Sequence, residues 1–427
     1  MSHHIAGTAR PALPPRASAK RWQWLLFATL LVAASTRLLL ASQWKGELLG
    51  PRSPLLYQAA TLGFNYFEMG PIRRGLAGTV VHLIGSDILL ATVVFHLASA
   101  FGVAVTTGLI FVRMKAPLVT RGVFAFVLVA IMLRWAEDAG RTDMAVASML
   151  AGSTLAMTRG RLVLASVLVC IGLFIHETSF IFGLPLLATL AWRQRFTLSS
   201  RAWWQAAAVF SLTLLLYAST VWLPHATPQA MAAMVRAKFA PDKIVDWAIY
   251  FAVSGARGVQ ASMCQNRTDP NYWLHWTGGL VSMAVMTFAL ARASRRDWAG
   301  AALAALPPFA FLCIVANDTS RWTMLASYNA WLVLATTRLD GRSPRPAAIG
   351  VSAAAVAFLL LTYPKPDKVD YPIYAGSPLI EKIARKLDGP RTPNVEEALQ
   401  RCDPEWRTVL EASGPLPVTS GARPVVP

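Results

Sequence analysis

Three short groups of ionisable residues interrupt an otherwise apolar sequence. The first runs from Glu137 to Asp143, the second is His176-Glu177, and the third runs from Asn317 to Arg321. Carboxylates and imidazoles can accept a proton in catalysis, and guanidinium groups bind phosphate through paired hydrogen bonds. Ionisable groups are costly at membrane depth and usually face a bundle interior or a water-filled cavity. The three groups therefore predict one polar site at the same end of several membrane helices.

Each acidic group also has a structural interpretation. Glu137 or Asp138 could belong to a solvated turn and pair with Arg134, one helical turn earlier. Asp143 could cap the N-terminus of the helix that follows it. His176 could simply hydrogen-bond to a neighbouring helix. These interpretations stay open beside the catalytic one.

Arginines supply the second type of candidate. Arg321 could bind an anion, or it could pair with Asp318 across one helical turn. The Arg73-Arg74 pair lies where a loop is expected to meet the membrane, and guanidinium groups there suit phosphate or a lipid headgroup. Glu68, just before the pair, could form a salt bridge with it. The candidate binding residues are Arg37, Arg73, Arg74, Arg141, Asp318 and Arg321.

The composition indicates a membrane protein. Of 427 residues, 55% are hydrophobic and only 15% are charged, whereas soluble proteins have about 25% charged residues. Apolar stretches of roughly 15 to 25 residues recur, which is the length that crosses a hydrocarbon core. The net charge of +18 is divided among small groups between these stretches. That distribution is an orientation signal of membrane proteins and argues against nucleic-acid binding.

We expect an all-α fold, a polytopic transmembrane helix bundle of about eleven spans. Residues 1–21 form a basic cytoplasmic segment, the bundle covers 22–363, and 364–427 form a small extracytoplasmic tail. Arg37, near the outer end of the first span, could reach the interface or hold an anion. The predicted spans are 22–43, 87–112, 122–136, 143–158, 162–176, 178–192, 202–223, 273–291, 298–316, 322–337 and 347–363.

Two long outer loops follow from this topology, at 44–86 and 224–272. The apolar pieces 54–64 and 75–85 in the first loop, and 245–253 in the second, are too short to cross and are expected to lie in the interface. Arginine outnumbers lysine, a bias typical of GC-rich bacterial genomes. We therefore expect a bacterial inner-membrane protein with a cytoplasmic N-terminus and an extracytoplasmic C-terminus.

One helical hairpin is predicted to be too short to reach the outer surface. Arg161 and Arg193 are both expected in the cytoplasm, so residues 162–192 must cross and return. This segment supplies about 46 Å of helix, or roughly 23 Å each way, against a core of about 30 Å. The tip, which carries His176-Glu177, is therefore expected to lie in a depression on the outer side.

The four cysteines fall into two classes. Cys170 and Cys313 lie inside predicted spans and are expected to be packing residues. Cys264 and Cys402 both lie outside the membrane, where an oxidising compartment permits a disulfide. Sequence leaves open whether these two cysteines pair.

The long first outer loop, the interfacial helices, the acids in outer loops and the extracytoplasmic tail together resemble the layout of the GT-C superfamily of membrane glycosyltransferases. The resemblance covers the layout of most of the chain. It implies a polyprenyl-phosphate-linked sugar as donor, membrane lipid as surroundings, and transfer to an envelope lipid or glycan at the outer membrane face. No cofactor is required, although carboxylates could hold a divalent metal ion.

The resemblance also implies roles for the polar residues. Such enzymes carry a catalytic acid in the first outer loop and further acids in the second. Glu68 or Asp138 would act as the general base. Arg37, Arg73 or Arg74 would stabilise the phosphate leaving group. The implied catalytic residues are Glu68, Glu137, Asp138, Asp143, His176 and Glu177.

Three other functions stay open at this point. A transporter would place ionisable residues near the membrane midplane, often within inverted repeats, but the two halves of the chain show no convincing repeat. A polymerase or ligase of surface polysaccharide would share the lipid-linked donor. A non-catalytic partner of an envelope assembly would need no reactive site. Motifs of soluble enzymes, such as the Walker loop and His-Glu-x-x-His, do not occur in the sequence.

Overall fold

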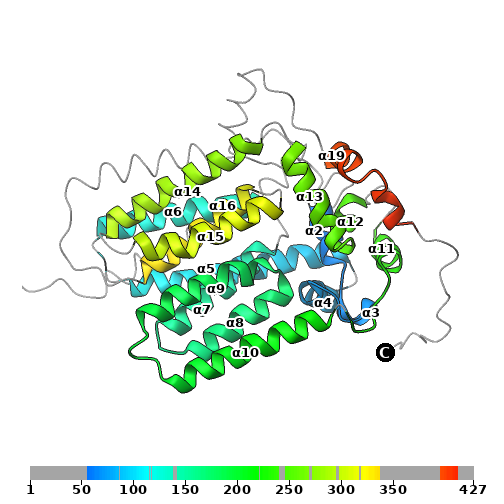
Figure 1. The fold of residues 1–427 in the computed structure, drawn as a ribbon. Helices are drawn as coiled ribbons and strands as arrows, with labels where there is room; N and C mark the ends of the chain where they lie inside the picture. Colours follow the sequence, from blue (N-terminus) through cyan, green and yellow to red (C-terminus); the bar gives the residue numbers. More distant parts are fainter. Residues whose placement is uncertain are drawn as a thin grey trace, which may run out of the picture.

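The computed structural model describes residues 55–85, 87–114, 116, 118–137, 142–220, 222–239, 246–268, 272–294, 298–316, 319–336 and 395–411. These residues form helices joined by turns, and there is no β-strand among them (Figure 1). The predicted all-α fold is confirmed for this part of the chain.

A bundle of long helices makes up most of the molecule, and the helices run side by side in Figure 1. Their packed faces share one continuous apolar core. Side chains of Asp87 and Ser199 cap the N-termini of two of them by accepting backbone hydrogen bonds. The bundle helices are α5 (Ile88–Arg113), α6 (Leu118–Glu137), α7 (Asp143–Met157), α8 (Leu162–Ile175), α9 (Thr178–Arg193), α10 (Ser200–Ser219), α14 (Tyr272–Ser294), α15 (Trp298–Val315) and α16 (Thr319–Ala335).

Each of these helices lies at a position where the sequence predicts a span. Only α5, α10 and α15 are, among the described residues, both long and apolar enough to cross a membrane by themselves. The first and last predicted spans, 22–43 and 347–363, lie outside the described residues. The predicted count of eleven spans therefore stays a prediction, whereas the helical character of the intervening segments is confirmed.

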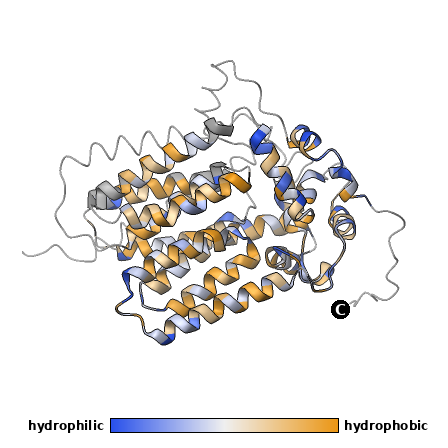
Figure 2. Cartoon of the chain, viewed as in Figure 1, coloured by the Kyte–Doolittle hydropathy of each residue, from blue (hydrophilic) through white to orange (hydrophobic). Residues whose placement is uncertain are grey.

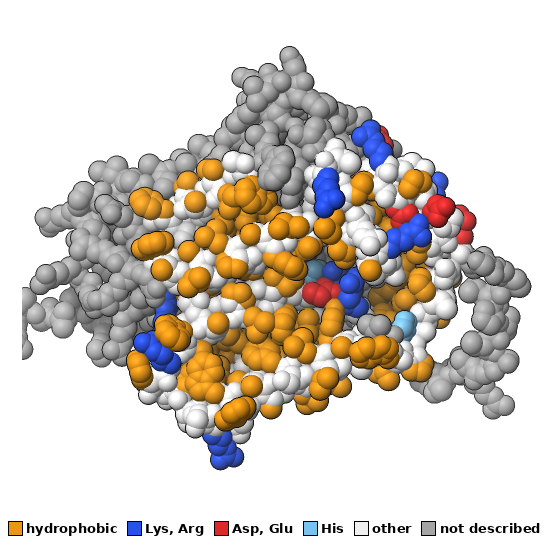
Figure 3. Space-filling view, in the orientation of Figure 1, with side chains coloured by type: hydrophobic (Ala, Val, Ile, Leu, Met, Phe, Trp, Pro, Cys, Tyr) orange, Lys and Arg blue, Asp and Glu red, His pale blue; other side chains and the backbone are white. Residues whose placement is uncertain are grey.

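The outer faces of the bundle carry large apolar side chains. On α10, Leu215 is 68% exposed, and Leu212 and Trp204 are also exposed. On α15, Leu303 and Ile314 are likewise exposed. The helices of the bundle are apolar along most of their length (Figure 2), and apolar side chains cover the face seen in Figure 3. Apolar patches of this extent mark surfaces that contact a membrane or a partner, so the bundle is consistent with a membrane protein.

A second group of shorter helices packs at one end of the bundle (Figure 1). We call this group the end lobe. It has a core of its own, which includes the buried side chains of Tyr250 and Trp406. Its elements come from the two predicted outer loops and from the predicted tail. They are α2 (Leu55–Leu62), α3 (Tyr66–Met69), α11 (Pro228–Arg236), α12 (Asp246–Val253), α13 (Ala256–Thr268), α19 (Val395–Cys402) and the 3-10 helix η2 (Trp406–Val409).

The apolar pieces predicted in the two loops are helical. They correspond to α2, to α4 (Gly75–Ile84) and to α12. Helices α2 and α4 both pack against α5, and buried residues of α4 such as Ala77 and Val81 belong to the core of the bundle. The predicted interfacial position of these helices in a bilayer stays a prediction.

Covalent and polar contacts attach the tail to the end lobe. Cys264 and Cys402 form a disulfide bond, so the pairing that the sequence leaves open is made. Asp403 accepts two hydrogen bonds from the Arg257 guanidinium and one from the Tyr250 hydroxyl. The bonds from Arg257 lower the pKa of Asp403. The free cysteines Cys170 and Cys313 are buried, as predicted for packing residues.

Two buried asparagines replace backbone hydrogen bonds that the helices lack. The side-chain nitrogen of Asn266 donates to carbonyl oxygens of Cys313, Ile314 and Ala316, at the C-terminus of α15. This contact joins the end lobe to the bundle. Inside the bundle, Asn329 donates to the Ala304 carbonyl at 3.0 Å. That carbonyl has no helical donor because the residue four positions later is Pro308.

Candidate functional site

The turn between α8 and α9 carries two of the predicted residues. Helix α8 ends at Ile175 because His176 adopts an extended backbone, with φ −163° and ψ 137°. The Nδ1 atom of His176 accepts a hydrogen bond from the backbone N–H of Thr178 at 3.2 Å. Burial and the charge of Arg74 lower the pKa of His176 well below its usual value. His176 is therefore neutral, with its proton on Nε2, and it caps the start of α9.

The carboxylate of Glu177 is the centre of the site. Its Oε2 atom accepts a hydrogen bond from Arg74 Nε at 2.5 Å, and its Oε1 atom lies 3.1 Å from Arg73 Nε. The hydroxyl of Tyr217, near the end of α10, donates to Oε1 at 2.7 Å. Burial alone would raise the pKa of Glu177, but the charges of Arg74 and Arg73 outweigh it and hold that pKa far below the usual range. Glu177 is therefore ionised.

A rigid loop presents the two arginines. Gly70 has φ 77°, and Arg74 is the only non-glycine residue of the described chain with a positive φ, at 62°. Left-handed backbone costs a non-glycine residue roughly 1–2 kcal/mol. A Cβ at Gly75 would overlap the ring of Tyr66, and a Cβ at Gly78 would overlap the carbonyl oxygen of Phe64. Close packing of this backbone therefore fixes where the arginine side chains begin.

A second ion pair joins α7 to α16. Arg321 donates from Nε and Nη2 to the two carboxylate oxygens of Asp143, at 2.6 and 2.5 Å. The Asp143 side chain is 2% exposed and the Arg321 side chain 10%. The N-cap of α7 is Thr142, without a side-chain hydrogen bond. Asp143 is therefore not the helix cap that the sequence suggests, but the partner of an arginine 178 positions later in the chain.

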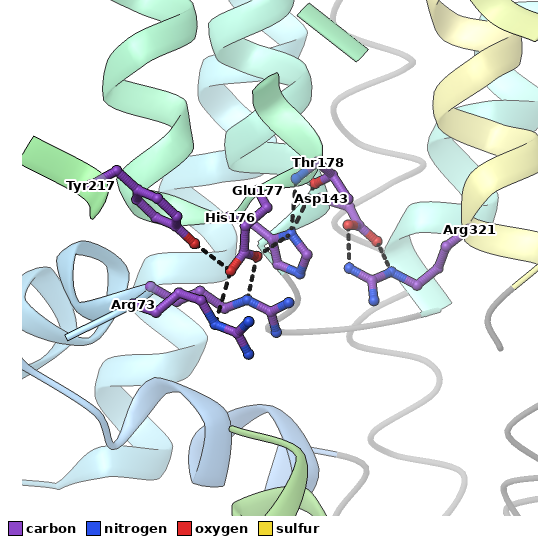
Figure 4. Close-up of polar contacts among 8 residues, drawn as sticks. Arg73, Asp143, His176, Glu177, Thr178, Tyr217 and Arg321 are labelled. Atoms are coloured by element: carbon purple, nitrogen blue, oxygen red, sulfur yellow. Dashed lines mark hydrogen bonds and ion pairs between the residues drawn. The ribbon is translucent and has the colours of Figure 1, made fainter. Parts of the chain in front are cut away.

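The two ion pairs belong to one cluster (Figure 4). The charge of Arg321 contributes to lowering the pKa of His176, which links the Asp143 pair to the α8–α9 turn. Six predicted residues thus come together from four separate segments of the chain. They are Arg73, Arg74, Asp143, His176, Glu177 and Arg321, and we call them, with Tyr217 and Thr178, the arginine cluster.

Tyr217 and Thr178 are the members that sequence reasoning missed. Tyr217 lies near the end of an apolar helix, where an aromatic residue usually indicates a membrane interface. Its hydroxyl partner, Glu177, is 40 positions away. Thr178 follows the acid in sequence, but nothing in its type indicates a contact with His176. No local pattern would have identified either residue.

Glu68 lies in a different network. Its carboxylate accepts hydrogen bonds from the side chains of Asn65 and Lys238, and His82 lies 4.0 Å away. Burial opposes ionisation of Glu68, but the bonds from Lys238 and Asn65 outweigh it and lower the pKa. The suggested salt bridge between Glu68 and the Arg73-Arg74 pair is therefore wrong. Lys238, which also donates to the Gly63 carbonyl, takes that place.

Several predicted residues cannot be assigned to the arginine cluster. Arg37, Asp138, Arg141 and Asp318 lie outside the described residues. Glu137 is the last residue of α6, and its side chain also lies outside the described part. Helix α7 begins at Asp143, a member of the arginine cluster.

Among the described residues, no group of three or more histidine, cysteine or acidic side chains is placed to hold a metal ion. The described members of the arginine cluster include three guanidinium groups and two carboxylates. Basic, acidic and histidine side chains gather in the middle of the face in Figure 3, between the apolar bundle and the end lobe. This arrangement suits an anionic group of a ligand that is otherwise apolar.

Comparison of the chain with protein-family models, with curated proteins and with solved structures gives no match in any of the three. A functional assignment for this chain therefore depends on the geometry of the arginine cluster.

Proposed function

We propose that the protein is a membrane glycosyltransferase that moves a sugar from a polyprenyl-phosphate donor to an envelope lipid or glycan. The Arg73-Arg74 pair at the end of an apolar helix bundle is the observation that carries the proposal. Both side chains are partly exposed, 34% for Arg73 and 39% for Arg74. Within the described residues, Arg73 and Arg74 bond Glu177 through Nε alone, which leaves their terminal nitrogens for a phosphate.

The reaction would place charge where these arginines can stabilise it. The acceptor hydroxyl transfers its proton to a carboxylate while its oxygen forms a bond to the anomeric carbon of the sugar. The bond from that carbon to the phosphate oxygen breaks, and the electron pair leaves with polyprenyl phosphate. Guanidinium groups next to the leaving oxygen stabilise the charge as it develops.

The general base is the part of the proposal that must come from outside the arginine cluster. Both oxygens of Asp143 accept bonds from Arg321, and Glu177 is held by Arg73 and Arg74. The lowered pKa of Glu177 makes it a poor base, and the carboxylate of Asp143 is buried against Arg321. Glu68 is likewise held by Lys238 and Asn65, which lower its pKa. We therefore assign the base to Glu137, the last residue of α6, or to Asp138, which follows it in the sequence.

The proposal is tested by incubating purified protein in lipid nanodiscs with labelled polyprenyl-phosphate sugars and an envelope lipid extract. Release of polyprenyl phosphate is measured, because that product is independent of the acceptor. We expect release by the wild type, loss of at least about a hundredfold in Asp138→Asn or in Glu137→Gln, and a similar loss in Arg73→Gln/Arg74→Gln.

A matched control is available at the other end of α9. Arg195 stacks on the rings of Trp192 and Phe196 and lies far along the helix from Glu177. Arg195→Gln removes a single arginine charge outside the arginine cluster and should leave release unchanged. Equal activity of the double arginine variant and the wild type would end the proposal, as would a wild type that releases no polyprenyl phosphate.

A further inference from the structure

The carboxylate of Glu177 binds the guanidinium groups of Arg73 and Arg74 in the way that an anionic ligand would. One of its carboxylate oxygens accepts a hydrogen bond from Arg74, and the other forms an ion pair with Arg73. Two neighbouring oxygens of a phosphate group offer the same geometry with more negative charge. A phosphate could therefore reach the Nε atoms only if the carboxylate withdrew from them.

We propose that Glu177 is an exchangeable internal anion, which holds Arg73 and Arg74 in the unliganded protein and yields them to a phosphate group of the ligand. This inference rests on the proposed function only in one respect, the identity of the lipid that carries the phosphate. Exchange itself requires no glycosyl transfer.

The contrast between the two ion pairs supports this assignment. Asp143 and Arg321 are both nearly hidden from solvent and form a bidentate pair between two bundle helices. Glu177 is 20% exposed, and its two arginines are exposed by a third or more. A ligand can therefore reach the second pair but not the first.

The acid is the part of this pair that can move. The backbone that carries the arginines is packed so closely at Gly75 and Gly78 that these positions admit no side chain. Glu177 lies in the short turn between α8 and α9 and has three rotatable side-chain bonds. After release, its carboxylate keeps the hydroxyl of Tyr217 as a donor. The exchange thus leaves no buried charge without a hydrogen bond.

A fixed supporting role for Glu177 makes the opposite prediction. If Glu177 only held the arginines in place for the ligand, then removal of its charge would weaken phosphate binding. If Glu177 competes with the ligand, removal of its charge strengthens binding. The sign of the change in dissociation constant therefore separates the two roles.

The experiment measures binding of three probes to purified protein in nanodiscs: a polyprenyl monophosphate, inorganic phosphate, and the corresponding polyprenol without phosphate. We expect Glu177→Gln to bind polyprenyl monophosphate about tenfold more tightly than the wild type, because one competing charge-assisted contact is removed. Arg74→Gln should weaken that binding by about tenfold or more. The polyprenol should bind equally to all variants. Binding of inorganic phosphate shows whether the phosphate group binds without a lipid chain.

Glu396→Gln is the matched control, because it removes one exposed acid from the end lobe and changes the net charge equally. If the glutamine variant does not fold, Glu177→Asp is used in its place. It keeps the charge but shortens the side chain, and it should bind phosphate more tightly than the wild type. Weaker phosphate binding in either folded variant overturns the exchange. Tighter binding of phosphate in a protein that releases no polyprenyl phosphate from the donor would instead retain the exchange and reject the proposed function.

Discussion

The ion pair between Asp143 and Arg321 offers a direct test of which acids are structural. We consider Asp143→Asn, which keeps the shape of the side chain and removes its charge. Both partners are almost fully buried, and both carboxylate oxygens are bonded to the guanidinium. Removing one member of a buried ion pair costs about 3–5 kcal/mol. We expect a loss of unfolding free energy of that size.

The magnitude can be assigned to the pair by a double-mutant cycle. Arg321→Met removes the guanidinium but keeps an extended apolar side chain. The double variant, Asp143→Asn with Arg321→Met, removes both charges of the pair. Replacing a buried ion pair by apolar or neutral groups is often close to neutral in stability. Residues in direct contact are coupled by about 0.5–3 kcal/mol, and two charge-assisted bonds place this pair near the upper limit. Because Asp143→Asn should lose about 3–5 kcal/mol and the double variant should stay near the wild type, we expect a coupling energy of about 3 kcal/mol or more.

Unfolding is followed in detergent micelles by tryptophan fluorescence. Trp322 is a suitable reporter because the Arg321 guanidinium lies 4.8 Å from the centre of its ring. A matched control is Asp246→Asn, which removes an acid from the half-exposed Arg236 pair in the end lobe and should cost under about 1 kcal/mol. A coupling energy below about 0.5 kcal/mol would refute the structural role, and Asp143 would return as a candidate catalytic acid.

Three further predictions concern the contacts that hold the fold around the site. Asn329→Leu should lower the unfolding free energy by about 1–3 kcal/mol, because the buried carbonyl of Ala304 loses its donor and that of Phe182 loses the bond from Asn329. The loss should be smaller in a Pro308→Ala background, where α15 supplies its own donor, and equal losses would contradict this explanation. Cys402→Ser should destabilise the end lobe by about 2–4 kcal/mol, seen as faster hydrogen exchange in α19 with α8 unchanged. Arg257 lowers the pKa of Asp403, so this acid stabilises the lobe above the unfolded pKa of about 4 and the contribution disappears as pH falls through the lower folded pKa. The melting temperature of the end lobe should therefore fall less between pH 6 and pH 2 in Asp403→Asn than in the wild type. An equal fall in both proteins would assign the pH dependence to other groups.

The boundaries of the bundle helices could be read from the sequence because local signals determine them. The predicted segments 162–176 and 178–192 differ from α8 and α9 by one residue at the ends. Arginines at both ends of this apolar segment and a polar pair in its middle mark where each helix begins and ends. The short pieces of the outer loops can be located in the same way, since α2, α4 and α12 are apolar runs between turns.

The assembly of the end lobe could not be read from local patterns. Its elements come from three separated segments, and the disulfide that joins two of them spans 138 positions. Neither the two loops nor the tail contains enough apolar residues to indicate a core by itself. The same limit applies to ion pairs, because helical spacing offers Arg321 only a local partner, whereas the structure pairs it with Asp143.

The ion pairs of Asp143 and Glu177 limit which carboxylates of the arginine cluster could act as a base. A carboxylate that must take a proton during catalysis cannot also be the permanent counterion of a buried guanidinium, because that pairing lowers its affinity for protons. Glu177 is such a counterion, because Arg74 and Arg73 lower its pKa, and it would remain one until a ligand anion took the arginines. Phosphate binding would therefore change the state of Glu177 at the moment when the donor is in place. Under this proposal, Arg73 and Arg74 would bind first the carboxylate of Glu177 and then the phosphate of the ligand, without a change in the backbone that carries them.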